Sequence, residues 1–88
     1  MYLHIGQDVV VATQSIIGIF DLDAASAKKA TRNFLSAATQ ENRVINVCDD
    51  LPRSFIVCVQ NGKQTVYVSQ ISSQTLQKRG RRDSIFEI

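Results

Sequence analysis

The dipeptide Asn61-Gly62 constrains the fold of this chain more than any other feature. It lies between two apolar runs rich in β-branched residues. It is also the preferred pair for a two-residue type I′ turn, because both turn positions need a positive φ. Residues 54–69 are therefore predicted to form a β-hairpin. The turn also sets the register, in which Val57 faces Val66.

This register gives the hairpin two unlike faces, because successive side chains of a strand point to opposite sides. One face is apolar along most of its length, and we expect it to lie in the core under a helix: Phe55, Val57, Val59, Val66 and Val68. The other face is mixed, and we expect its centre to contact a second subunit: Ile56, Cys58 and Tyr67.

Upstream of the hairpin, short apolar runs alternate with polar turns. The runs at 2–5, 9–12 and 16–20 predict a three-stranded meander. Asp21 or Asp23 is expected to cap a central helix over residues 24–38, because a carboxylate there accepts hydrogen bonds from free N–H groups of the first turn.

Downstream of this helix, a short strand is expected at 44–48. Ser72 is expected to cap a short C-terminal helix that ends at Gly80, and residues 81–88 are expected to form a tail. The prediction is a single α+β domain of residues 1–88 with small antiparallel sheets.

Charge is unevenly distributed along the chain, although the net charge is only +2. Residues 1–23 contain three Asp and no Lys or Arg, whereas residues 51–82 contain six basic residues and no acid. Such asymmetry can steer an anionic ligand to one end of the molecule. It can equally place the acidic end of one subunit against the basic end of the next, in a head-to-tail oligomer.

No motif for catalysis or metal binding is present, so we expect no enzyme, no cofactor and no small-molecule substrate. The one histidine, His4, has no cluster of Cys or carboxylates near it in sequence. Cys48 and Cys58 lack metal-ligand spacing and are expected to be buried thiols in a reducing compartment. Without a signal peptide or a membrane-length apolar run, we expect a cytoplasmic protein with no membrane partner.

Four segments together resemble the RemA/RemB family of bacterial extracellular-matrix regulators: 2–6, 16–21, 54–59 and 69–79. The resemblance implies a small α+β protein that activates biofilm-matrix operons by binding DNA, assembles into rings and presents arginine-bearing loops to the phosphate backbone. The loop before the hairpin keeps Arg53, but the loop before the third strand reads Thr13-Gln14-Ser15 and has no arginine. Gln14 there can offer a phosphate a hydrogen bond but no charge.

Two hypotheses follow. The first is a homo-oligomeric regulator that binds double-stranded DNA through phosphate contacts, for which the candidate residues are Gln14, Arg53, Lys63, Lys78, Arg79, Arg81 and Arg82. The second is an oligomeric interaction module that regulates through a protein partner without binding DNA itself. The basic run over residues 51–82 favours the first hypothesis, and the uncharged Thr13-Gln14-Ser15 loop favours the second.

Overall fold

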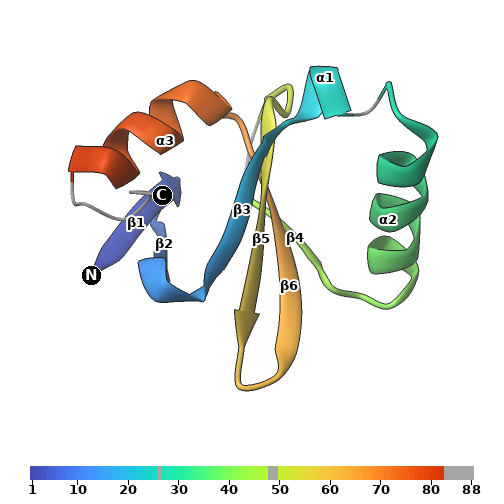
Figure 1. Ribbon diagram of the computed structural model, residues 1–88, viewed down its shortest axis with the longest axis horizontal. Helices are drawn as coiled ribbons and strands as arrows, with labels where there is room; N and C mark the ends of the chain where they lie inside the picture. Colours follow the sequence, from blue (N-terminus) through green and yellow to red (C-terminus); the bar gives the residue numbers. More distant parts are fainter. Residues whose placement is uncertain (26, 48–49, 83–88) are drawn as a thin grey trace.

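The computed structural model describes residues 1–25, 27–47 and 50–82, which form a mixed α+β fold with two sheets (Figure 1). The strands are β1 (Tyr2–Gly6), β2 (Val9–Ala12), β3 (Ile16–Asp21), β4 (Val44–Asn46), β5 (Ser54–Gln60) and β6 (Lys63–Ser69). The helices are the 3₁₀ turn η1 (Thr13–Ser15), α1 (Leu22–Ala25), α2 (Lys29–Gln40) and α3 (Ser73–Arg82). The predicted α+β class is confirmed.

The predicted hairpin is confirmed in full as β5 and β6. Val57 pairs with Val66, and the register holds from Ser54 opposite Ser69 to Gln60 opposite Lys63. Asn61 and Gly62 have φ values of 54° and 77°, as a type I′ turn requires.

The predicted three-stranded N-terminal meander is wrong for its third strand, which does not pair with the second. β1 pairs with β2 in a separate two-stranded sheet, whereas β3 pairs with β5 at the edge of a four-stranded sheet of order β3-β5-β6-β4. The cause lies in η1, whose Thr13 hydroxyl donates to Met1 O at 3.1 Å and whose Ser15 hydroxyl donates to Ala12 O at 2.6 Å. These bonds fix a 3₁₀ turn that leads the chain from one sheet to the other.

The fourth strand also differs from the antiparallel expectation. β4 covers Val44–Asn46 only and pairs with β6 in parallel, while Cys48 lies outside the described residues. The parallel direction follows from α2, which returns the chain to the hairpin-tip end of the sheet before β4 begins (Figure 1).

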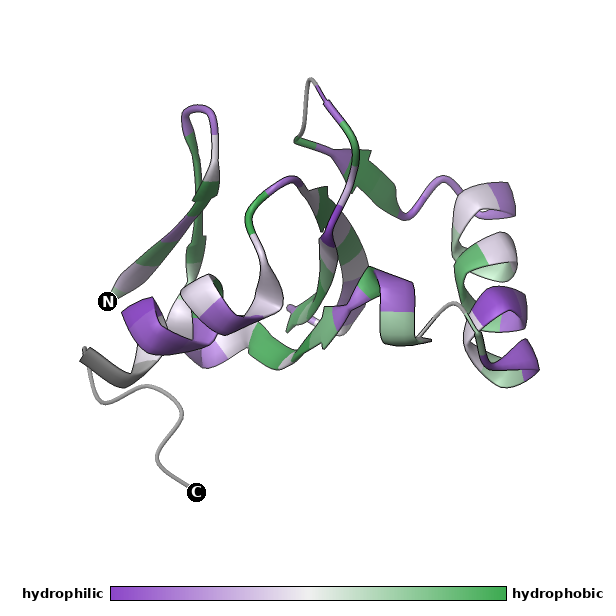
Figure 2. Ribbon diagram, turned by 90° about the horizontal axis from the view of Figure 1, so that it is seen from above, coloured by the Kyte–Doolittle hydropathy of each residue, from purple (hydrophilic) through white to green (hydrophobic). Residues whose placement is uncertain are grey.

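The four-stranded sheet separates two apolar clusters. On one face, α2 packs Phe34, Leu35 and Ala38 against Phe55, Val57 and Val66, which confirms the predicted core face of the hairpin for these three hairpin residues. The prediction is wrong for Val59, which lies near the hairpin turn opposite Gln64 and is 37% exposed. The other face is covered by the β1–β2 sheet and α3, and the cluster there contains Leu3, Ile5, Val11, Ile56, Cys58 and Leu76. Figure 2 shows the hydrophobic strands between helices with hydrophilic outer surfaces.

The central helix is divided in two. The Asp21 carboxylate accepts the N–H of Ala24 at 3.1 Å, so the predicted cap is confirmed for α1. Lys28 is extended, with φ −93° and ψ 132°, and separates α1 from α2. Leu22, the first residue of α1, donates its N–H to Arg53 O at 3.0 Å, and α2 lies on the sheet beyond the break.

The C-terminal helix is longer than predicted. The Ser72 hydroxyl accepts the N–H of Thr75 at 3.2 Å, which confirms the cap. The helix does not end at Gly80 but continues to Arg82. Gly80 is buried and lies within the helix, so it does not mark the helix end.

Candidate nucleic-acid interface

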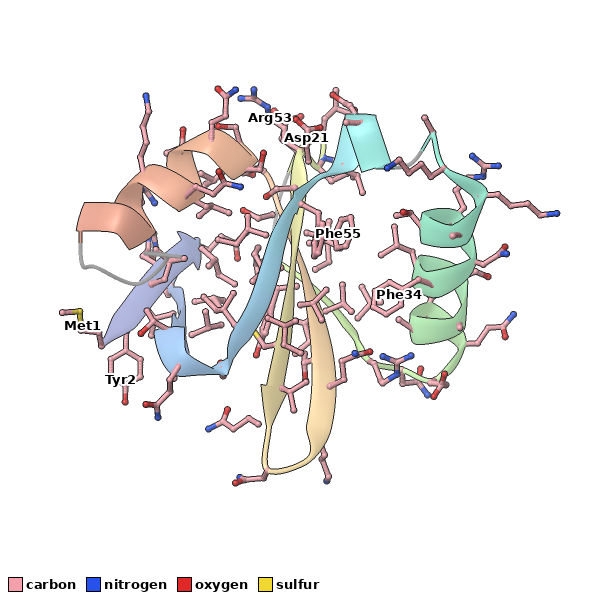
Figure 3. All side chains as sticks on the ribbon, viewed as in Figure 1. Met1, Tyr2, Asp21, Phe34, Arg53 and Phe55 are labelled. Carbon is pink, nitrogen blue, oxygen red and sulfur yellow. The ribbon has the colours of Figure 1, made fainter. Side chains whose placement is uncertain are left out.

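Arg53 lies immediately before β5, at the end of the four-stranded sheet where β3 finishes (Figure 3). Its N–H donates to Ser69 O at 2.8 Å, and its carbonyl accepts the N–H of Leu22 at 3.0 Å. The backbone is thereby fixed between β6 and α1, while the side chain is exposed. An exposed guanidinium on this fixed backbone can bind a phosphate through two parallel hydrogen bonds.

Asp21 is one acidic neighbour of Arg53 at this end of the sheet (Figure 3), and Asp23 in α1 and the exposed Asp50 are other acids close in sequence to these residues. The Asp21 carboxylate caps α1 through the N–H of Ala24. The Asp21 charge reduces the positive potential near Arg53. The Arg53 guanidinium is nevertheless available to a ligand, because it makes no ion pair with another described residue.

Further basic side chains lie at the same end, since α1, the start of α2 and α3 are all gathered there (Figure 1). Lys28 and Lys29 stand where α2 begins, and Lys78 lies on α3. All three are exposed, and none makes an ion pair with another described residue. We call Lys28, Lys29, Arg53 and Lys78 the basic edge. Lys28 and Lys29 were not among the predicted site residues. The sequence feature that could have indicated them is the outer face of the predicted helix, which carries basic residues and no acid.

Gln14 and Lys63 lie at the opposite end of the sheet. Gln14 is in η1, before β3 begins, and Lys63 follows the hairpin turn. The intervening strand β5 has seven residues, which span about 20 Å at the rise of a β-strand. The structure therefore does not bring these two predicted site residues to Arg53.

The remaining predicted basic residues belong to the end of α3. Arg79 is half-buried, and its guanidinium donates to His4 O at 3.3 Å, which ties α3 to β1. The side chains of Arg81 and Arg82 lie outside the described part of the structure. Among the sequence candidates whose side chains are described, Arg53 and Lys78 share the basic edge.

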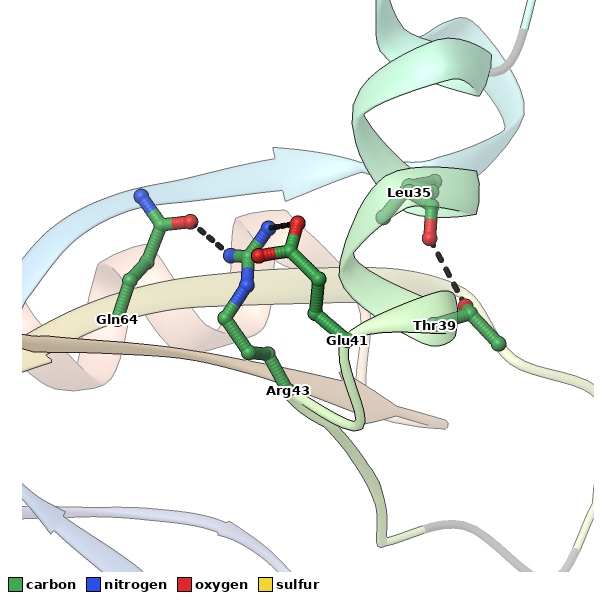
Figure 4. A network of polar contacts seen from close by, with 5 residues as sticks. All are labelled: Leu35, Thr39, Glu41, Arg43 and Gln64. Atoms are coloured by element: carbon green, nitrogen blue, oxygen red, sulfur yellow. Dashed lines mark hydrogen bonds and ion pairs between the residues drawn. The ribbon is translucent and has the colours of Figure 1, made fainter.

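Arg43 is a basic residue with a structural role instead. Its guanidinium pairs with Glu41 at 3.2 Å and also donates to the Gln64 side chain (Figure 4). The guanidinium carbon lies 6.0 Å from the centre of the Phe34 ring. These contacts join the end of α2 to the hairpin, so we do not count Arg43 in the basic edge.

The face predicted to contact a second subunit is covered by the chain itself. Ile56 and Cys58 are 0% and 4% exposed, beneath β1, β2 and α3, which corrects the expectation for both residues. Tyr67 is half-buried beside them. Burial raises the pKa of the Cys58 thiol above its ordinary value of 9.0, although a hydrogen bond with Ser15 opposes the shift. Burial also raises the pKa of Tyr67.

Sites of two other kinds are absent from the described residues. No group of His, Cys, Asp and Glu within residues 1–25, 27–47 and 50–82 is placed to hold a metal ion. No helix in that part of the chain has the length and apolar character needed to cross a membrane.

Comparison with known proteins gives two matches. Residues 2–79 match the model of a family described as RemA-like, extracellular matrix regulatory protein A-like. The chain is also 40% identical over 88 residues to extracellular matrix regulatory protein B of Bacillus subtilis (strain 168), and the match covers 100% of this chain and 98% of that protein.

Proposed function

The chain belongs to the RemA-like family of extracellular matrix regulatory proteins, and on that premise we propose that it regulates matrix genes by binding DNA as a homo-oligomer. The observation that carries the proposal is the basic edge. It places four exposed cationic side chains, none paired with a described acid, along one end of the molecule.

The basic edge suits the DNA backbone better than the bases. Lys and Arg that neutralise phosphates release condensed counterions, and this release supplies sequence-independent affinity. The backbone of Arg53 has a fixed position in the basic edge, because its N–H and its carbonyl both form hydrogen bonds with neighbouring elements. The lysines are longer and more mobile charges that adapt to phosphate positions.

The start of α2 adds a second source of positive potential at this edge. Lys28 precedes the helix in an extended conformation, and its side chain makes no capping hydrogen bond. The free N–H groups of the first helical turn carry the positive end of the helix dipole, which favours an anion. A phosphate there would meet both these N–H groups and the ammonium groups of Lys28 and Lys29.

Oligomerisation would allow the basic edge to bind DNA tightly, although each copy has only a few basic side chains there. One chain offers only a few phosphate contacts, so its affinity for DNA alone would be low. Several copies would repeat the edge, and each further contact would then be made at a high effective concentration.

The test is a titration of duplex DNA from a matrix-gene promoter with the full-length protein, followed by mobility shift or fluorescence anisotropy. The affinity should fall steeply between roughly 50 and 200 mM salt, because each phosphate contact returns counterions. Binding that is insensitive to salt would contradict a phosphate-contacting edge.

A second function is favoured by the end of the sheet that carries η1. Its Thr13-Gln14-Ser15 turn has no charge, and apolar residues such as Ile17 are exposed on the adjoining strand. An oligomeric interaction module that works through a protein partner would assemble in light scattering but would shift no duplex even at low salt.

A further inference from the structure

An apolar groove lies between α2 and the four-stranded sheet. Its volume is about 330 Å³, and its lining is mainly Ile17, Phe20, Ala30, Phe34, Phe55 and Val57. Ile17 is 64% exposed and Phe20 is 42% exposed, so the groove leaves large apolar side chains in water. Such exposure marks a surface that another apolar segment covers. We call it the α2 groove.

The aromatic floor of the α2 groove is held in place by its own packing. The Phe20 ring stacks on Phe55, with centroids 4.9 Å apart and planes inclined by 18°. A Cβ atom at Gly18 would lie 2.7 Å from the Phe20 ring, so only glycine at that position lets the ring lie back over the strand. The floor is therefore preformed and needs no partner to assemble it.

The groove is bordered by a free strand edge. β3 is the terminal strand of the four-stranded sheet, and no strand lies beyond it in the described structure (Figure 1). Backbone groups on such an edge can bind an extended peptide, whose alternate side chains then enter an adjoining pocket. The α2 groove together with the β3 edge thus fits a short extended segment with apolar side chains.

Residues 83–88 of this chain have that character. The segment reads Asp-Ser-Ile-Phe-Glu-Ile, with two acids among three apolar residues. The exposed ammonium groups of Lys28 and Lys29 immediately precede Ala30 in the groove lining and complement these acids. We propose that residues 83–88 of one copy dock in the α2 groove of the next copy.

The distance in the fold favours a second copy over the same chain. α3 and α2 lie on opposite faces of the four-stranded sheet, and α3 ends at Arg82 beyond β1 (Figure 1). Phe86 follows Arg82 by four residues, which reach about 14 Å when fully extended. Crossing from one covering layer to the other requires roughly 20 Å, at about 10 Å per layer. The segment therefore reaches a neighbour's groove more readily than its own.

A tail-to-groove contact is heterologous, because the surfaces that meet are different on the two chains. Repetition of such a contact produces a ring when the rotation closes. This inference rests on the homo-oligomer part of the proposed function and adds the surfaces that would form the oligomer. Lys28 and Lys29 serve in both proposals, so the test below measures self-association in the absence of DNA.

The test uses full-length variants in size-exclusion light scattering. Phe86→Asp should weaken self-association at least about tenfold, equivalent to ~1.4 kcal/mol for each tail-to-groove contact. Ser84→Asp is the matched control, because it adds the same charge to the same segment without removing an apolar side chain, and it should assemble like the wild type. Ile17→Asp should weaken association from the groove side, and Ala30→Asp replaces it if circular dichroism shows that the first variant is unfolded.

Mixing the variants tests the pairing itself. Phe86→Asp keeps an intact groove and Ile17→Asp keeps an intact tail, so an equimolar mixture should form a heterodimer and nothing larger. Failure to form that heterodimer would overturn the pairing of tail with groove. If Phe86→Asp assembles as well as the wild type, this inference is overturned, and the groove must bind something other than residues 83–88. The homo-oligomer would then still stand. A monomeric wild type would overturn the homo-oligomer as well.

Discussion

Ser69 and Ile5 are joined by a buried hydrogen bond that crosses from the four-stranded sheet to β1. The Ser69 hydroxyl donates to Ile5 O at 2.5 Å, and the same oxygen accepts the N–H of Ile71 at 3.0 Å. Both Ser69 and Ile5 are 0% exposed. One hydroxyl therefore links β1, β6 and the segment that leads into α3.

Ser69→Ala should destabilise the fold by about 1–3 kcal/mol, because it leaves a buried carbonyl and an N–H without their partner. Urea denaturation followed by circular dichroism measures the change. Ser36→Ala is the matched control, since Ser36 is exposed on α2 and its replacement should change the free energy of unfolding by less than about 0.5 kcal/mol. Equal effects of the two variants would mean that the link between the sheets contributes nothing.

Gly18→Ala should destabilise the fold by about 1–3 kcal/mol, because its new methyl group would displace the Phe20 ring from Phe55. Thermal unfolding in a double-mutant cycle with Phe20→Leu isolates the cause. The cost of Gly18→Ala should become smaller in the Phe20→Leu background, since the clash involves the aromatic ring. An undiminished cost would place the effect in the backbone instead.

The free energy of unfolding should decrease as pH rises above 9.0, the ordinary pKa of a cysteine thiol. Burial raises the pKa of Cys58 in the folded chain, so the unfolded state ionises first and gains stability until the folded pKa is passed. One such group changes stability by at most about 1.4 kcal/mol per pH unit. Cys58→Ala lacks this thiol and should show a shallower alkaline decrease in urea titrations at a series of pH values; an unchanged slope would contradict the assignment.

The parts of the fold that follow from local chemistry were predictable. Asn61 and Gly62 fix the hairpin register because the turn type sets which strand residues face each other. Asp21 and Ser72 mark helix starts because their side chains accept the free N–H groups there. Each of these features depends on a few neighbouring residues only.

The parts that depend on distant partners were not predictable. β3 pairs with β5 rather than β2. The reason is that η1 redirects the chain, and β5 has a free edge on the side away from β6. Ile56 and Cys58 have the alternation of a half-covered face, but the β1–β2 sheet covers them. For the site, Arg53 was found from charge and family pattern, whereas the position of Lys28 and Lys29 at the same end depends on how α1 and α2 are placed. The separation of Arg53 from Lys63 follows from the predicted hairpin register.

This separation supplies the sharpest test of the basic edge. Arg53→Ala and Lys63→Ala each remove one exposed positive charge, but from opposite ends of β5 and β6. Arg53→Ala should weaken binding to promoter DNA at least about fivefold, the equivalent of ~1 kcal/mol. It should also lower the slope of log affinity against log salt by roughly one unit for each phosphate that Arg53 neutralises in the wild type. Lys63→Ala should leave both quantities close to those of the wild type.

The comparison separates a located site from a general effect of charge. If net charge alone attracted DNA, the two variants would lose affinity equally, because long-range attraction depends little on which end carries the charge. Lys28→Ala should resemble Arg53→Ala, since Lys28 belongs to the same edge through a different element. Weaker binding with Lys63→Ala but not with Arg53→Ala would move the DNA contact to the hairpin tip and overturn the basic edge.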